Sequence, residues 1–196
     1  MKLILASASP RRKMMLTASG IPIHGVMPSE ICEDRHDNED PVTYARRLSI
    51  EKAKAVSPAG CWVLAADTIV HVGTEVFGKP KDDTHASAIL ATLAGGWHWV
   101  TTAWCLRWGD EDPSSSRTQV ADYSTTRVRF RQLSIAEIAS YVATGDGIDK
   151  AGGYGIQGLG AVLVEELEGS YTNVVGLPLG PVITALASVG LTPVHP

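Results

Sequence analysis

The stretch WHWVTTAWCLRW, residues 97–108, and the stretch QVADYSTTRVRF, residues 119–130, are two long β segments separated by the turn-rich residues 109–116. Two such segments next to each other in the chain predict paired strands and favour a mixed sheet over a purely parallel one. Shorter strands and helices alternate on both sides of them without an internal repeat, which is the pattern of an α/β protein. We therefore expect one α/β domain over residues 1–196, with a mixed, twisted sheet and flanking helices.

Helix and strand signals account for the rest of the chain. A serine or aspartate that can cap a helix comes before each of four predicted helices, and these caps are Ser9, Asp40, Asp82 and Ser134. Proline follows the first two caps, at the first helical position, which it favours. The other expected elements are strands over 2–6, 62–66 and 161–167, a hairpin with arms 69–70 and 76–77, and a last helix from about Pro181.

The composition limits the kind of function. The chain has 196 residues, of which 44% are hydrophobic and 19% charged, and this is enough apolar material for a full core. Its formal net charge of −4 argues against a nucleic-acid-binding or membrane-surface protein, which would carry a basic excess. A site for a polyanion therefore needs a local basic cluster or a metal ion.

Targeting and cysteine signals favour a cytoplasmic protein without a membrane or nucleic-acid partner. No segment approaches the roughly 20 apolar residues of a membrane span. The apolar run 3–5 is also shorter than the roughly 7–15 residues of a secretion-signal core. Cys32, Cys61 and Cys105 fit no metal or redox spacing, so we expect reduced thiols, two of them buried.

Residues 7–13, SASPRRK, combine a helix start with three cations. The helix dipole already places positive charge there, so each cation in the first turn costs about a few tenths of a kcal/mol. A docked anion reverses that balance, because free backbone N–H groups, the Ser7 and Ser9 hydroxyls and the guanidinium groups all suit phosphate oxygens. The alternative is an ordinary solvated basic helix start, since capping alone explains Ser9 and Pro10.

Asp67 interrupts the apolar run VLAADTIV, residues 63–70. A buried carboxylate without a partner is costly, so we expect Asp67 to be paired, metal-bound or at a strand end that faces a cleft. A general base or a Mg²⁺ ligand is the functional interpretation, and a turn aspartate is the structural alternative. Lys52 and Lys79 are nearby cations that could equally lie on an ordinary surface.

The stretch DKAGGYGIQGLG, residues 149–160, contains the pattern G-x-G-x-x-G at 153–158. A β-like segment follows at 161–164, where a dinucleotide-binding fold needs a helix, so we reject the dinucleotide interpretation. The glycines still allow a backbone to approach a ligand closely. Gln157 offers a donor and an acceptor that suit the edge of a nucleobase.

Taken together and in this order, the segments resemble the Maf family of nucleotide pyrophosphatases. Each motif alone is weak, but the ordered set is specific and spans nearly the whole chain. The matching segments are Leu5-Ala6-Ser7-x-Ser9-Pro10-Arg11-Arg12, Glu51-Lys52-Ala53, Ala66-Asp67-Thr68-x-Val70, Gly78-Lys79-Pro80, Gly95 with Val100-Thr101, residues 149–158, and Gly169-Ser170-Tyr171 with Val175-Gly176-Leu177-Pro178.

The resemblance implies a mixed α/β fold with a cleft between two lobes, and a homodimer. It also implies hydrolysis of a nucleoside triphosphate between its α and β phosphates with a divalent metal, Mg²⁺ or Mn²⁺. Asp67 matches the residue that accepts the proton in the family, and it also matches a ligand of the metal. Glu33 helps to hold the metal, with Glu30 or Asp34 as alternatives for that role.

The same resemblance assigns the substrate contacts. The implied phosphate-binding residues are Ser7, Arg11, Lys52 and Lys79, of which Lys52 and Lys79 are also catalytic. Arg12, Thr68 and Gln157 match the positions that distinguish the subgroup acting on dTTP and UTP. The related subgroup for a methylated guanine nucleotide has other residues at the positions of Arg11, Thr68 and Gln157, so this chain sides with pyrimidines.

The residues themselves agree with this chemistry. Asp67, directly or through Mg²⁺, can orient and deprotonate the water that attacks the α-phosphorus, while Arg12 and the two lysines neutralise charge on the pyrophosphate leaving group. Two other functions stay open: a non-catalytic, nucleotide-sensing regulator of septum formation, and a pyrophosphatase for non-standard purine triphosphates. Asp67 together with a metal favours an enzyme, and Gln157 with Thr68 favours pyrimidines.

Overall fold

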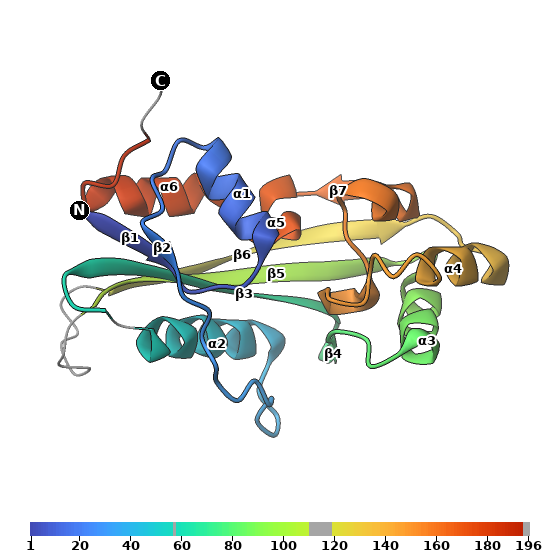
Figure 1. Cartoon of the computed structure of the whole chain (residues 1–196). Helices are drawn as coiled ribbons and strands as arrows, with labels where there is room; N and C mark the ends of the chain where they lie inside the picture. The colour runs from blue at the N-terminus through green and yellow to red at the C-terminus, as the bar shows by residue number, and fades with distance from the viewer. Residues whose placement is uncertain (57, 110–118, 194–196) are drawn as a thin grey trace. The chain divides into compact units, whose positions relative to one another are not determined.

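The computed structural model describes residues 1–56, 58–109 and 119–193 (Figure 1). Its strands are β1 (Lys2–Leu5), β2 (Gly25–Val26), β3 (Cys61–Val72), β4 (Glu75–Phe77), β5 (Trp97–Trp108), β6 (Gln119–Phe130) and β7 (Val164–Glu168). They form a seven-stranded sheet in the order β2-β1-β3-β5-β6-β7, with β4 paired to β3. β1 pairs in parallel with β2 and β3, whereas β3 and β4, and β6 and β7, are antiparallel. The predicted mixed α/β fold is confirmed.

The α-helices include the four with predicted caps, α1 to α4, which begin where the sequence predicts. The α-helices are α1 (Pro10–Ala18), α2 (Pro41–Ala55), α3 (Asp83–Leu93), α4 (Ile135–Val142), α5 (Tyr171–Val175) and α6 (Leu179–Ser188), with 3₁₀ turns η2 (Ala151–Gly153) and η3 (Gly158–Leu163). All four predicted caps accept a backbone N–H of the first helical turn, and Ser134 forms a full capping box with Glu137. In the described part of the chain, no helix is long and apolar enough to cross a membrane.

The described residues divide into two compact units. Unit 1 takes its residues from Met1–Asp67, Thr102–Ser124 and Gly176–Pro196, and unit 2 from Thr68–Thr101 and Thr125–Val175. Asp67 is therefore the last residue of unit 1 in β3. The single domain expected from the sequence stays a prediction.

In unit 1, helices cover both faces of β1 and the first part of β3. Figure 1 shows α1 and α6 on one side of these strands and α2 on the other. Val63 and Ala65 of β3 pack with Ala53 of α2 in one buried cluster. Because side chains alternate along a strand, Asp67 belongs to the same face as Val63 and Ala65. The face that α2 covers thus also carries the carboxylate.

Unit 2 has an apolar core of its own, to which α3 and α4 contribute. Tyr154 enters this core from the glycine-rich segment, and its ring meets the edge of Phe130 at 4.6 Å between centroids. Tyr154 Oη also lies 2.7 Å from Nε2 of the buried His98. Gly152 N–H donates to the Gly78 carbonyl at 3.1 Å, so the glycine-rich segment lies beside the turn that carries Lys79.

The predicted break in β3 is wrong. The sequence predicts a strand over 62–66 and a separate hairpin, but β3 runs from Cys61 to Val72 without interruption. The polar pair at 67 and 68 suggests a strand end. Instead the Asp67 carboxylate is paired with a lysine, so the strand continues through it. The hairpin with β4 is present as predicted, with Val70 opposite Phe77.

The strand predicted over 161–167 also begins late, because η3 occupies residues 158–163. A Cβ on Gly160 would lie 2.1 Å from the Gly155 carbonyl oxygen, so glycine is what lets these two backbone stretches touch. η3 is not the α-helix that a dinucleotide site needs, and that interpretation stays rejected. The short α5, which the sequence does not predict, is capped by Ser170. Residues 110–116 of the predicted turn stretch lie outside the described residues.

Candidate active site

Asp67 and Lys52 form a buried ion pair in unit 1. Lys52 Nζ lies 2.6 Å from Asp67 Oδ1, and the two side chains are only 11% and 10% exposed. Lys52 reaches the sheet because it lies on the inward stripe of α2, four residues after Leu48 and three after Ser49, both buried. The structure thus gives Asp67 the partner that a buried carboxylate requires.

Burial and the ion pair act in opposite directions on Asp67. Burial raises the pKa of the Asp67 carboxyl above the ordinary value of an aspartate, and the charges of Lys52 and Arg12 oppose that rise. The net direction is upward. A carboxylate with a raised pKa is a stronger proton acceptor, which suits a general base.

Glu33 is the second carboxylate at Lys52. Its Oε1 lies 2.8 Å from Lys52 Nζ, and its side chain is 51% exposed. In the described structure neither Glu30 nor Asp34 contacts Lys52, and the Asp34 carboxylate instead accepts the Cys32 thiol at 3.2 Å. Of the three candidates for the second metal ligand, Glu33 is the one whose position fits.

Helix α2 also holds the loop that carries Glu33. Tyr44 Oη donates to the Glu33 carbonyl at 2.6 Å, and Arg47 donates to the Asp34 carbonyl at 2.9 Å. Arg47 is itself held by Glu39, at 2.8 Å. No motif of the sequence marks Tyr44 or Arg47 as a site residue. Their spacing of three residues, which puts both on one side of the helix, is the only signal that could have done so.

These residues fit a divalent metal that brings further ligands with it. Among the described residues, no group of three or more His, Cys, Asp or Glu side chains gathers to hold an ion. Mg²⁺ in proteins is usually bound by one or two carboxylates and completed by waters and substrate phosphates. Glu33 and Asp67 are such a pair of carboxylates, so the donor set suits a metal that binds together with a nucleotide.

Arg12 joins three separate segments of unit 1. Its Nε donates to the Gly176 carbonyl at 2.8 Å, and its Nη1 donates to Ser7 Oγ at 3.0 Å and to the Ala66 carbonyl at 2.8 Å. Ala66 directly precedes Asp67 in β3, so Arg12 fixes the backbone beside the carboxylate. Several guanidinium N–H groups of Arg12 thus donate hydrogen bonds to the protein itself. Phosphate binding by Arg12 stays a prediction.

Ser7 and Arg11 lie at the predicted anion site. Ser7 is buried and its Oγ accepts the Ser9 N–H at 3.3 Å, while Arg11 is half-buried in the first turn of α1. Ser9 caps the helix through the Arg12 N–H at 3.5 Å. Capping and anion binding both use this geometry, so the phosphate role of Ser7 and Arg11 stays a prediction.

The other predicted site residues belong to unit 2. Thr68 follows Asp67 in β3 and, by the alternation of the strand, belongs to the opposite face. Lys79 is exposed and Gln157 is half-buried. Neither side chain has a hydrogen bond or ion pair within the described ranges, so both remain available to a ligand. Their roles stay predictions.

Two tyrosines fix the backbone just before Gln157. Tyr154 is held by His98, as described above, and Tyr141 Oη accepts the Gly155 N–H at 3.3 Å. Tyr141 Oη in turn donates to Asp146 at 2.8 Å. Although the Gln157 amide has no hydrogen-bond partner among the described residues, its chain segment is therefore anchored by two phenol groups.

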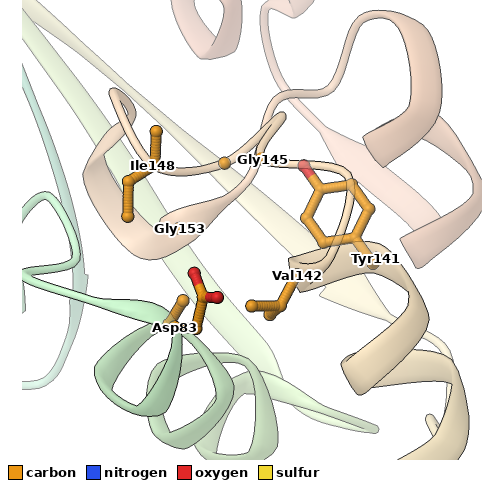
Figure 2. A pocket seen from close by; sticks show the side chains of 8 residues that line it. Asp83, Tyr141, Val142, Gly145, Ile148 and Gly153 are labelled. Carbon is orange, nitrogen blue, oxygen red and sulfur yellow. The ribbon is translucent and has the colours of Figure 1, made fainter.

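A small pocket in unit 2 contains none of the predicted site residues. Figure 2 shows Asp83, Tyr141, Val142 and Ile148 around it, and Ala86, Gly145, Gly147 and Gly153 complete its lining. Its free space of about 10 Å³ is room for about one water molecule. This pocket is too small to be the site of a nucleotide.

Comparison with known proteins gives one consistent result. The sequence pattern of the Maf family, described as Maf-like protein, matches residues 2–189. The chain is 45% identical to the dTTP/UTP pyrophosphatase of Rhizobium meliloti, covering 96% of this chain and 93% of that protein. It is also 45% identical to the dTTP/UTP pyrophosphatase of Thermus thermophilus, covering 97% and 96%. A solved nucleoside-triphosphatase / dITP/XTP pyrophosphatase from Mycobacterium abscessus covers 99% of the chain at a TM-score of 0.42 and 14% identity, too low to support an inference.

Proposed function

Because the chain belongs to the Maf-like protein family, we propose that it hydrolyses nucleoside triphosphates, with dTTP and UTP preferred, to the nucleoside monophosphate and pyrophosphate. The observation that carries the proposal is the buried carboxylate of Asp67, paired with Lys52 beside the helix start that carries Ser7 and Arg11 and is joined to β3 by Arg12. A proton acceptor and anion-binding groups are the parts that attack on a phosphate requires.

In this reaction the oxygen of a water molecule forms a bond to the α-phosphorus, and the bond from that phosphorus to the bridging oxygen breaks. Asp67 accepts a proton from the attacking water, and its raised pKa makes it suited to do so. Lys52 and Arg11 donate to phosphate oxygens and stabilise the charge that accumulates on departing pyrophosphate. Lys79 is proposed to donate to phosphate oxygens and to stabilise the same charge.

A divalent cation, Mg²⁺ or Mn²⁺, is proposed to bind with the nucleotide at Glu33 and Asp67. When bound, it supplies positive charge at the phosphates. Arg12 acts in unit 1 as a structural support, because it fixes the carbonyl of Ala66 next to the proton acceptor. The family resemblance further supports a homodimer that acts in the cytoplasm.

Preference for thymine and uracil is proposed to come from Gln157. Its amide can present an acceptor and a donor to the N3 and O4 edge of these bases. The lack of a hydrogen-bond partner for this amide in the described structure supports that role. A wrong base leaves a polar group unpaired, which costs about 1–3 kcal/mol, or roughly ten- to a hundredfold in kcat/KM.

A panel of nucleotides assayed for released pyrophosphate with Mg²⁺ and with Mn²⁺ tests the proposal. We expect dTTP and UTP to be cleaved well, with weaker activity on GTP and ATP. Absence of pyrophosphate release from every triphosphate would overturn the enzymatic function and favour a nucleotide sensor. A preference for GTP or its methylated form would overturn only the pyrimidine assignment.

A further inference from the structure

We propose that Lys52 is the cation that holds Glu33 and Asp67 together in the free protein, and that it must leave them when a divalent metal binds. Two consequences follow. The nucleotide-free protein binds the metal weakly, and it takes up metal and triphosphate together. The proposal rests on the proposed function for the identity of the triphosphate, but its test needs no turnover.

The geometry is that of one cation shared by two carboxylates. Lys52 Nζ lies 2.6 Å from an oxygen of Asp67 and 2.8 Å from an oxygen of Glu33. Both distances are those of charge-assisted hydrogen bonds. Each carboxylate therefore directs one oxygen at the ammonium group, and the described residues add no third acidic, histidine or cysteine ligand.

A metal ion on the two carboxylate oxygens that hold Lys52 would compete directly with the ammonium group. Mg²⁺ binds oxygen at about 2.0–2.1 Å, so an ion on the same oxygens would lie close to a positive nitrogen. Repulsion between the two cations opposes that arrangement, and it is strong because Lys52 and Asp67 are nearly buried. Metal binding to these oxygens without a nucleotide therefore requires Lys52 to give up two ionic partners and gain none.

A triphosphate removes this obstacle. It offers anionic oxygens to Lys52, whose four-carbon stem lets the ammonium group move while helix α2 stays in place. It also offers phosphate ligands to the metal. With both ligands present every charge has a partner again, so metal and nucleotide must strengthen each other's binding by the same factor.

The test is Mn²⁺ binding to the nucleotide-free protein, measured by titration calorimetry on the wild type and on Lys52→Met. We expect weak binding by the wild type and at least about tenfold tighter binding by the variant, because the competing cation is gone. Lys54→Met is the matched control: it removes one positive charge from an exposed position on the same helix. Its affinity should stay within about twofold of the wild type, as screened surface charges contribute little.

Further variants keep the test decisive. Lys52→Gln has no charge but can still donate to both carboxylates, and it should also bind Mn²⁺ more tightly if Lys52→Met fails to fold. Adding Glu33→Gln to Lys52→Met should return the affinity to the wild-type range. Mn²⁺ should raise the melting temperature of the Lys52 variants more than that of the wild type.

Two results would overturn the proposal: wild type and Lys52 variants that bind Mn²⁺ equally, or a gain in Lys54→Met as large as in Lys52→Met. Neither result depends on pyrophosphate release. A protein that shows the expected Mn²⁺ affinities but cleaves no nucleotide would keep this proposal and lose the proposed function.

Discussion

Lowering the pH from 7 to 4 should destabilise this protein through one buried side chain, His98. Burial, with a smaller effect from the neighbouring His71, lowers the pKa of His98 to about 4 from its ordinary value of 6.5. The folded protein therefore keeps His98 neutral over a pH range in which the unfolded chain protonates it. The stabilisation is complete above pH 6.5 and is lost as the pH falls toward 4. This difference between the pKa values of the folded and unfolded states lowers the free energy of unfolding by about 3 kcal/mol. That is a large fraction of the roughly 5–15 kcal/mol by which domains are stable.

The structure explains why the charged form is excluded. His98 is 1% exposed, Nε2 is hydrogen-bonded to Tyr154 Oη at 2.7 Å, and the ring stands edge-on to Phe130 at 4.8 Å. Its Nδ1 has no hydrogen-bond partner among the described residues. A proton added at Nδ1 would thus put a charged, unsatisfied donor in an apolar core, which is costly.

Urea unfolding, followed by tryptophan fluorescence at several pH values from 7 to 4, measures the effect. The matched variant is His98→Gln, whose amide can still bond to Tyr154 but does not titrate in this range. The variant is expected to be less stable than the wild type at pH 7. The difference between their free energies of unfolding should fall by about 3 kcal/mol between pH 7 and pH 4, because only the wild type is destabilised by protonation of His98. Parallel curves for the two proteins would refute the reasoning, because the pH dependence would then come from other groups.

Three further predictions concern the site. Asp67→Asn should lower kcat by about 10²–10⁴-fold. The affinity for a UTP analogue with a CH₂ group between the α and β phosphorus atoms, measured without a divalent metal, should stay nearly unchanged. Turnover within about tenfold of wild type would remove Asp67 from the role of base. Arg12→Ala should lower the free energy of unfolding by about 2 kcal/mol or more, whereas Lys13→Ala, at an exposed position, should change it by less than about 0.5 kcal/mol; equal effects in chemical denaturation would contradict the support role of Arg12. Gln157→Glu should reduce the ratio of kcat/KM for UTP over GTP by about ten- to a hundredfold, and an unchanged ratio would mean that another residue reads the base.

Elements set by local signals could be predicted from the sequence. The four capped helices start at the predicted positions, and the two long strands have the predicted bounds. A cap needs only the residues of one helical turn, and a strand pattern only its own side chains. The start of β7 was missed because glycine contacts between separate stretches, and not the local pattern, fold residues 158–163 into a turn.

The partners of the site residues could not be predicted, because they depend on tertiary contacts. Asp67 reads as a carboxylate that needs a partner, but the sequence does not say that Lys52, on a neighbouring helix, provides it. The sequence places Arg12 among three cations at a helix start that suits an anion, yet in the structure its Nε donates to a carbonyl 164 positions further along the chain. His98 carries no motif at all, and its importance is visible only from its burial beside Tyr154.

The end of strand β1 explains why the site lies where it does. β1 pairs with β3 as far as Leu5 opposite Leu64, and Ala6 N–H makes the last bond of this ladder, to the Leu64 carbonyl. The next carbonyl of β3 along that edge is Ala66, and Arg12 supplies its donor in place of a strand. β3 thus continues past the end of its parallel neighbour, and its next residue, Asp67, lies at the carboxyl edge where ligands bind in α/β sheets. The position of the carboxylate depends on the alternation of the strand: a shift of one residue would turn Asp67 away from Lys52, and the carboxylate would lose its partner.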